Sequence, residues 1–460
     1  MILNDKTVQT SLLQNIEDNV KNVNKTCIKD IYDSLIYKRI QEKTKFILTY
    51  NSNFDGAPLF KSLKQSFWPL QLYINELPVE IRFKNIILAA LWLTNKEPKP
   101  QFMNLYISTF HHQAAILMER GVDIIVHATG EIINFKVYSA LWCVDSVARP
   151  IAQNRIQFNG YDGCSWCYIK GKHDGTTMRY PISQMTDPPL RTHEKYILDV
   201  QTAVRCKKVV NGVKGYSAML LFPLLDCVWG FPPDYMHGAL LGVTRQIWMK
   251  WSKKHLSKSD KEKIDKRLLL LKPPHEIHRL PRSIFDCVKW KASEWRSWML
   301  FYSVLCIQGI LRNELFHSYL LFVKSMHTLL TCNISEQDLI ECDKNLQIFV
   351  LESQKYYGES FMTFNVHSLL HFVESVRISG PLWASSTFPF ENGIFLFKQN
   401  VNAAKGISYQ ISVNWLKRYS LHSRIDASSK SIICKEYCYN LFNHRLLTNC
   451  VQTENVRYEH

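Results

Sequence analysis

The sequence predicts an α/β protein, and three observations lead to this prediction. Three β-rich segments with short connections follow one another within residues 45–94. A segment with helical periodicity and then another β-rich segment come directly after them. Beyond residue 234 the periodicity is mainly helical. The order β-β-β-α-β is typical of a sheet in which a helical crossover returns the chain to a strand parallel to the first.

The β-rich segments are identified by β-branched and aromatic residues that stop at turn residues. They are Lys45–Asp55 before Gly56, Phe67–Asn75 before Glu76-Leu77-Pro78, Asn85–Thr94 before Pro98, and Glu131–Val144 before Asp145-Ser146. Short connections between the first three predict an antiparallel meander, and the fourth segment predicts one or two strands. Apolar residues at helical spacing predict a helix over 101–120, with Gly121 as its C-terminal cap.

The rest of the chain divides by composition. Many glycines and prolines make 151–230 loop-rich, whereas 234–375 is mainly helical, and a further helix is expected from near Phe390. The predicted organisation has five parts: a helical lead-in (1–43), the first part of an α/β core (44–155), an insertion with a Cys/Gly-rich loop and a basic helical region (156–375), the C-terminal part of the core (376–425) and a tail (426–460).

Composition narrows the classes of function. With 46% hydrophobic residues in 460, disorder is excluded, and a net charge of +16 predicts attraction to a polyanion, either nucleic acid or an anionic membrane. The longest apolar stretch, Trp298–Leu311, is shorter than the roughly 20 residues of a membrane-spanning helix, and the N-terminus does not resemble a secretory signal. Thirteen cysteines, an odd count, predict reduced thiols in the cytosol or nucleus.

Two aspartates follow predicted strands that a right-handed crossover would make parallel neighbours, so Asp55 and Asp145 are expected side by side. Glu391, at the start of a helical segment, is the candidate third acid. Mg²⁺ prefers such oxygen ligands, and two ions about 3.5–4 Å apart activate a water or a 3′-hydroxyl and stabilise the leaving oxygen. The alternative is structural: Asp55 is a turn residue before Gly56, and Glu391 complements a helix dipole.

Cysteine and histidine spacing suggests a second metal site. Cys164-Ser-Trp-Cys167 has the spacing of half a zinc site. The candidate partners are His173 and His237, with His193 and Cys206 as further distal ligands; two buried thiols in a Gly-rich turn are the alternative. His367 and His371 share a helical face and could bind a metal together, but the spacing favours two histidines packed in a helix core.

Positive charge is concentrated in 245–296, which holds fifteen Lys/Arg and six Asp/Glu. Cations neutralise phosphates, and the tryptophans among them (Trp248, Trp251, Trp290 and Trp295) would either stack on exposed bases or pack inward beneath a solvated face. The predicted DNA-binding residues are Lys253, Lys254, Lys258, Lys261, Lys263, Lys266, Arg267, Lys289, Lys291 and Arg296. Lys253–Arg267 also has the composition of a nuclear import signal.

Ordered short motifs from about residue 30 to residue 420 resemble the En/Spm (CACTA-type) transposases, particularly their animal branch. The motifs include Asp55-Gly-Ala-Pro-Leu-Phe-Lys-Ser, Cys143-Val-Asp-Ser-Val-Ala-Arg-Pro, Phe158-Asn-Gly-Tyr-Asp-Gly-Cys-Ser-Trp-Cys, Gly230-Phe-Pro-Pro-Asp-Tyr-Met-His-Gly, Phe364-Asn-Val-His-Ser-Leu-Leu-His and Phe388-Pro-Phe-Glu-Asn-Gly. The resemblance implies an RNase H-like core with a large, mainly helical insertion before the last of three acids. It matches Asp55 to the first acid, Asp145 to the second and Glu391 to the third, with Asp234 and Glu294 as other candidates for the third.

The resemblance implies an enzyme of DNA transposition that uses two Mg²⁺ or Mn²⁺ ions for DNA cleavage and strand transfer, carries a structural Zn²⁺, acts as a homodimer on transposon ends and resides in the nucleus. The alternative is an inactive, domesticated or decayed transposase that serves as a DNA-binding or scaffold protein. The three intact acids favour the enzyme, whereas the lack of an N-terminal zinc finger before the core favours the alternative. A structure-specific nuclease is a third hypothesis.

Overall fold

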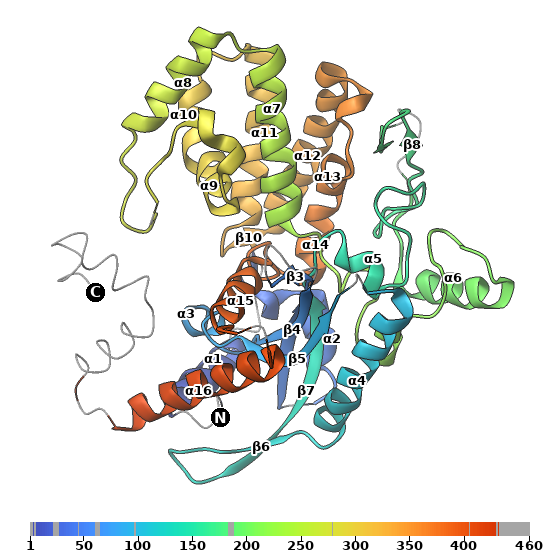
Figure 1. Cartoon of the computed structure of the whole chain (residues 1–460), viewed down its shortest axis with the longest axis vertical. Coiled ribbons are helices and arrows are strands. Elements are labelled where there is room, and N and C mark those ends of the chain that lie inside the picture. Colours follow the sequence, from blue (N-terminus) through green and yellow to red (C-terminus); the bar gives the residue numbers. More distant parts are fainter. Residues whose placement is uncertain are drawn as a thin grey trace.

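The computed structural model describes residues 6–21, 27–44, 46–59, 65–95, 98–182, 188–277, 279–403 and 405–428, together with Leu3 and Ser431. Most of the predicted C-terminal tail lies outside these residues. The described chain is a mixed α/β protein in which a curled mixed sheet and its covering helices form one half, and a group of helices forms the other half (Figure 1).

The central sheet has six strands among the described residues. They are β2 (Ile47–Phe54), β3 (Ala57–Pro58), β4 (Ser66–Ile74), β5 (Ile87–Thr94), β6 (Val122–Ile125) and β7 (Ile132–Trp142). β4 pairs antiparallel with both β2 and β5, and β7 lies parallel to β2. Helix α4 (Pro100–Glu119) precedes the β6–β7 hairpin, whose strands are antiparallel. The predicted antiparallel meander, helix and parallel strand are confirmed.

Two short strands of this central sheet were not predicted. β3 pairs with the start of β4, and β6 follows α4 directly after Gly121. Gly121 has a φ of +76° and donates its backbone N–H to Leu117 O at 3.1 Å. This left-handed geometry favours glycine and confirms the predicted end of the helix.

Helices cover both faces of the sheet. Met103, Ile107 and Phe110 of α4 pack with Phe54 and Trp142 on one face. The opposite face is covered by α2 (Leu35–Gln41), α15 (Phe388–Gln399) and α16 (Ile407–Ser428). All eight residues of β2 are buried as a result, so the middle of the sheet is an internal layer, whereas β6 and the start of β7 have exposed residues.

The remaining elements of this half are two longer helices, α1 (Lys6–Lys21) and α6 (His193–Cys206), and several short helices and strands. The short elements are β1 (Cys27–Ile28), η2 (Ile31–Asp33), α3 (Val79–Arg82), α5 (Ala148–Ala152), β8 (Lys172–His173), β9 (Met178–Arg179) and η3 (Ala218–Leu221). Helix α6 was not predicted within the loop-rich segment. The Thr192 side chain accepts a hydrogen bond from Lys195 N at its start, and Tyr196, Val200 and Ala203 form its buried face.

Residues 236–379 form the second half, which confirms the predicted helical character. Its elements are η4 (Met236–Thr244), α7 (Arg245–Lys254), α8 (Lys258–Leu270), η5 (Ile284–Lys289), α9 (Ala292–Ser297), η6 (Trp298–Tyr302), α10 (Ser303–Ile307), α11 (Asn313–Leu329), β10 (Ile334–Ser335), α12 (Glu336–Tyr357), η7 (Glu359–Phe361), α13 (Phe364–Ser368), η8 (Leu369–His371) and α14 (Phe372–Ser379). These elements share their own hydrophobic core. β10 pairs with β1, which ties this half to the N-terminal segment.

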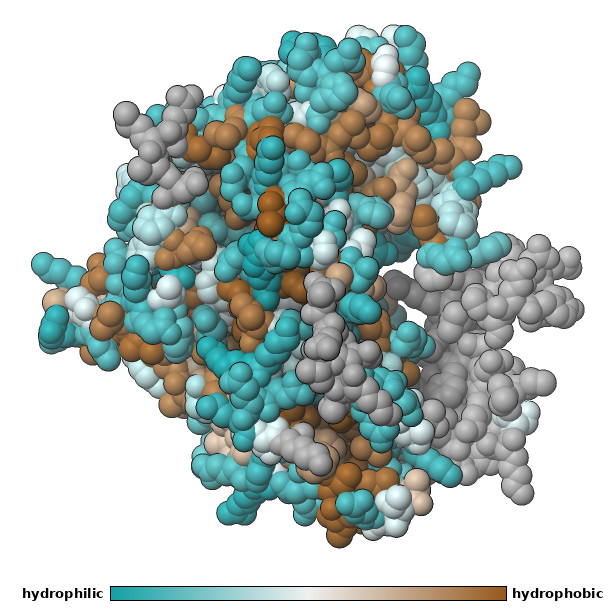
Figure 2. All heavy atoms as spheres, turned by 180° about the vertical axis from the view of Figure 1, so that it is seen from behind, coloured by the Kyte–Doolittle hydropathy of each residue, from teal (hydrophilic) through white to brown (hydrophobic). Residues whose placement is uncertain are grey.

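The surface is mixed in character. Seen from behind, most of the molecule is covered by hydrophilic side chains, with hydrophobic groups between them (Figure 2). Among the described helices, none has the length and apolar character needed to cross a bilayer.

Candidate functional site

The ends of β2 and β7 place Asp55 and Asp145 at the same edge of the sheet. The parallel pairing runs to Ser52 opposite Trp142, and Cys143 N continues it by donating to Ser52 O at 2.7 Å. The Asn53 side chain then donates to Cys143 O at 2.6 Å. Both aspartates follow immediately after this joined segment, as expected for parallel neighbours.

Glu391 reaches the same edge from helix α15, which packs against β4. Gln71 Nε2 donates to Phe390 O at 3.1 Å, and the rings of Tyr73 and Phe390 stack with centroids 5.0 Å apart. A Cβ on Gly393 would lie 2.0 Å from Gln71 Oε1, so a larger residue there would force the Gln71 side chain, which bonds Phe390 O, to move.

The three carboxyl groups influence one another. Burial, followed by the charges of Asp145 and Glu391, raises the pKa of Asp55 to about 7. Burial also raises the pKa of Glu391, although a side-chain hydrogen bond with Asp55 lowers it in part. A hydrogen bond between two carboxyl groups needs a proton on one of them, and this proton removes the repulsion between two carboxylates. A divalent cation bound between them would remove the same repulsion without the proton.

Asp145 is oriented by the backbone that follows it. Its Oδ1 accepts hydrogen bonds from Val147 N at 3.0 Å and from Ala148 N at 2.6 Å, at the start of α5. These bonds tie the Asp145 carboxylate to the first turn of α5, so the position of this helix fixes the carboxylate at the sheet edge.

Asp234 and His237 stand beside the three acids. Asp234 Oδ2 lies 2.7 Å from His237 Nδ1 and accepts from Thr387 Oγ1 at 2.8 Å, one residue before α15. Burial opposes protonation of His237, but the hydrogen bond and charge of Asp234, with added contributions from Asp145 and Glu391, raise its pKa to about 9. His237 therefore places a positive charge at the edge of the acidic cluster.

The other candidates for the third acid have different partners. Glu294 accepts from Arg282 Nε at 2.6 Å in the helical half, away from the sheet edge. Asp234 is occupied by His237 and Thr387. Glu391 is the remaining candidate whose charge acts directly on Asp55.

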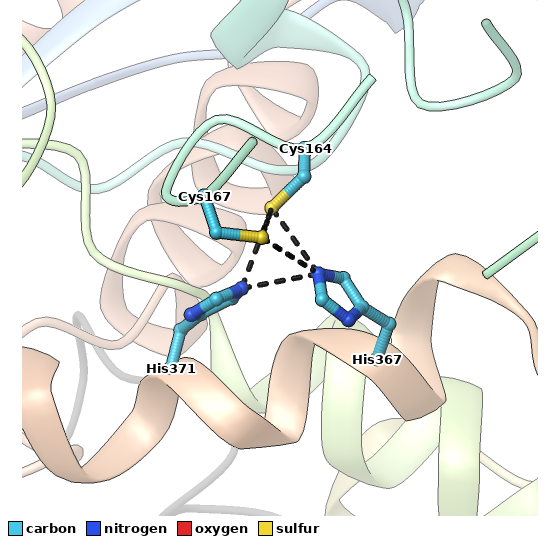
Figure 3. Close-up of side chains that lie close together, drawn as sticks. All are labelled: Cys164, Cys167, His367 and His371. Carbon is cyan, nitrogen blue, oxygen red and sulfur yellow. Dashed lines mark hydrogen bonds between the residues drawn. The ribbon is translucent and has the colours of Figure 1, made fainter. Parts of the chain in front are cut away.

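Four buried side chains form a second cluster. Cys164, Cys167, His367 and His371 present ligand atoms that all lie within 4.8 Å of one another (Figure 3). Sγ to Sγ is 3.6 Å, the closest Sγ to Nε2 distances are 3.3 and 3.4 Å, and Nε2 to Nε2 is 3.1 Å. Tetrahedral Zn²⁺ with ordinary bond lengths requires about 3.8, 3.6 and 3.3 Å for these pairs. The cluster could hold a metal such as Zn²⁺.

The two thiols respond oppositely to this environment. Burial disfavours ionisation of Cys164, but the hydrogen bond with Cys167 and the charges of His371 and His367 outweigh it and hold the pKa of Cys164 well below its ordinary value. The same hydrogen bond, together with burial, raises the pKa of Cys167 strongly. One proton is thus held between the sulfurs, and a bound metal would displace it.

The predicted set of zinc ligands was half wrong. His173 is exposed on β8, where its Nδ1 accepts from Gly175 N, and His237 is bound to Asp234. His193 accepts from Cys227 N, and Cys206 is exposed. His367 and His371, interpreted from sequence as histidines of a helix core, are instead the partners of the two cysteines. The sequence signal for this pairing was two histidines one helical turn apart in a chain that also holds a Cys-x-x-Cys without a second cysteine pair.

The basic region separates into a buried and a solvent-facing part. Trp248, Trp251, Trp290 and Trp295 are all buried in the helical core, so the structure agrees with the second alternative, in which they pack inward beneath the charged side chains. Nine of the ten predicted DNA-binding cations are exposed, and Lys261 is half-buried. The region therefore exposes its positive charge to solvent while these four tryptophans lie beneath it.

Comparison of the sequence with models of known protein families and with curated proteins gives no match. The arrangement of the side chains therefore carries the functional argument.

Proposed function

We propose that the protein is a transposase-derived enzyme that cleaves DNA and transfers strands, with Asp55, Asp145 and Glu391 as its acidic trio. The observation that carries this proposal is the meeting of three carboxyl groups from residues 55, 145 and 391, at the ends of two parallel strands and the start of a helix. We further propose that the sheet is an RNase H-like core and that the helical half is its insertion. The strand order and the helical crossover support this assignment.

The trio fits divalent cations of the hard type. Its donors are carboxylate oxygens, and the pKa of Asp55 is raised first by burial and then by the charges of Asp145 and Glu391, which a cation would neutralise. When bound, two Mg²⁺ or Mn²⁺ ions would supply an activated water or 3′-hydroxyl and charge neutralisation at the phosphate. The chain's own contribution is to hold Asp145 by the start of α5 and Glu391 by the Asp234–Thr387 contact.

The remaining parts have supporting roles in this proposal. Cys164, Cys167, His367 and His371 would hold a Zn²⁺ with no open position, which is typical of a structural site. The exposed lysines of α7 and α8 would neutralise the DNA backbone. A homodimer on two transposon ends and residence in the nucleus remain expectations from the resemblance.

The test is cleavage of a DNA duplex that carries terminal inverted repeats flanking the gene, in the presence of Mg²⁺ or Mn²⁺. Wild-type protein is expected to nick the repeat end and join it to target DNA. Asp55→Asn and Asp145→Asn should abolish both reactions and keep or strengthen DNA binding, because a negative charge near phosphate is removed. Asp123→Asn, an equal charge change at an exposed position of β6, should leave cleavage intact. Binding without any cleavage by wild-type protein would contradict the proposal and favour the inactive DNA-binding alternative.

A further inference from the structure

The Cys164–Cys167 turn contacts more than its metal partners. Between the two cysteines, Ser165 Oγ accepts a hydrogen bond from Arg149 Nε at 3.2 Å. Trp166 Nε1 donates to Phe231 O at 3.0 Å. Arg149 lies four residues after Asp145, and Phe231 lies three residues before Asp234. The same four-residue turn is thus tied to both segments that deliver charge to the acidic cluster.

Arg149 is the more direct of these two links. Its side chain is fully buried at 2% exposure, and its guanidinium lies 4.1 Å from the ring centroid of Trp166. Its backbone N–H donates to Asp145 O at 3.1 Å in the first turn of α5. The helix start that bonds the Asp145 carboxylate is therefore anchored, through one side chain, to the cysteine turn.

The electrostatic surroundings of Arg149 agree with this link. Burial lowers the pKa of Arg149 to about 10, although the charges of Cys164, Asp145 and Asp234 raise it in part. One guanidinium nitrogen, Nη2, is buried without a hydrogen-bond partner. Burying a cation with an unpaired donor costs free energy of folding. The position of Arg149 between the two clusters therefore points to a role there.

We infer that Arg149 is a positioning residue that couples the Cys164/Cys167/His367/His371 centre to the acidic trio, so that occupation of the first strengthens divalent-cation binding at the second. The inference rests on the proposed function for its second site. With metal bound, the turn is fixed, Trp166 and Ser165 hold the guanidinium, and α5 holds Asp145. Without it, only hydrogen bonds between sulfur and imidazole join the turn to His367 and His371, and α5 is held less firmly.

The experiment measures Mn²⁺ binding to the zinc-loaded full chain by the paramagnetic resonance signal of free Mn²⁺. Arg149→Gln is expected to weaken Mn²⁺ binding about tenfold, within the range for loss of an outer-sphere partner, while zinc content stays at the wild-type level. Arg149→Lys keeps the charge but loses the planar stack and should fall between the two. Ser165→Ala removes one hydrogen bond and should cause a smaller loss in a chain that keeps its core.

The matched control is Arg155→Gln. Arg155 is equally buried and donates to Cys164 O at 3.0 Å, but the main charges acting on it are those of Arg191, Tyr196, Cys164 and Asp199 rather than those of the three acids. Its removal should leave Mn²⁺ affinity unchanged as long as zinc remains bound. Coupling is also reciprocal, so Mn²⁺ should slow zinc loss to a chelator in wild-type protein and not in Arg149→Gln.

Two results would overturn the inference. The first would refute the coupling alone, and the second would refute the proposed function as well. If wild-type protein binds Mn²⁺ and Arg149→Gln and Ser165→Ala bind it equally well, the coupling is wrong and the acidic site stands. If zinc-loaded wild-type protein binds no Mn²⁺, both the coupling and the proposed function fail.

Discussion

Proton release on metal binding is the sharpest consequence of the acidic cluster. The pKa of Asp55 is raised to about 7 by burial and by the charges of Asp145 and Glu391. A divalent cation binds the ionised carboxylate, so it must displace the proton that this site holds below neutral pH. Affinity for Mn²⁺ should therefore rise with pH by about tenfold per unit and level off above pH 7.

The expected magnitude follows from the raised pKa. At pH 5.5 only about 3% of a carboxyl group with a pKa near 7 is ionised, so Mn²⁺ should bind roughly thirtyfold more weakly than at pH 8. An unperturbed aspartate would be almost fully ionised at both values. Because Asp55 and Glu391 titrate together, the proton belongs to the pair rather than to one residue.

Titration calorimetry in buffers of different ionisation enthalpy counts the released protons directly. Close to one proton per bound ion is expected at pH 6, and almost none at pH 8. Asp145→Asn removes the second-largest cause of the raised pKa and should shift the pH dependence to lower values. Mn²⁺ affinity that is independent of pH between 5.5 and 8 would refute the reasoning, because it would show that burial and the neighbouring charges do not hold a proton at this site.

Three further predictions concern the metal centre, the sheet and the basic face. His371→Ala should abolish bound zinc and lower the melting temperature, whereas His173→Ala should leave the zinc content by elemental analysis unchanged. Burial raises the pKa of Glu76 to about 7, so the stability that comes from its protonation is lost as pH rises through that value. Glu76→Gln should therefore stabilise the protein in urea unfolding by up to roughly 3 kcal/mol at pH 8 and leave its stability unchanged near pH 4.5. Equal effects at both pH values would contradict this. Lys254→Ala with Lys258→Ala should weaken binding to unrelated DNA sequences alike and reduce the salt dependence by up to about 0.9 in log–log slope per lost phosphate contact; an unchanged slope would remove this face from the DNA interface.

Much of the sheet could be predicted from the sequence because its signals are local. β2, β4, β5 and β7 are rich in apolar residues, some of them β-branched or aromatic, and they stop at turn residues. A right-handed crossover then dictates which strands are parallel. β3 and β6 escaped prediction because each has at most four residues. Helix α6 carried a detectable signal, a Thr192 cap before apolar residues at helical spacing, which the surrounding glycines and prolines obscured.

The metal centre could be predicted only in part, because its two halves are separated by two hundred residues. Local spacing identified Cys164 and Cys167 as candidate ligands, and it also showed that His367 and His371 share a helical face. Nothing local indicates that α13 packs against the cysteine turn, which depends on the fold of the whole helical half. Sequence proximity favoured His173 instead, and the structure places it at the surface.

The most direct test of the account is to locate both metals in crystals of the zinc-loaded protein soaked in Mn²⁺, with anomalous diffraction recorded at the manganese and zinc edges. The account predicts a manganese peak in contact with carboxylate oxygens of Asp55, Asp145 and Glu391, and a zinc peak enclosed by Cys164, Cys167, His367 and His371. The absence of manganese among the three acids would contradict the central claim, whatever occupies the cysteine–histidine centre.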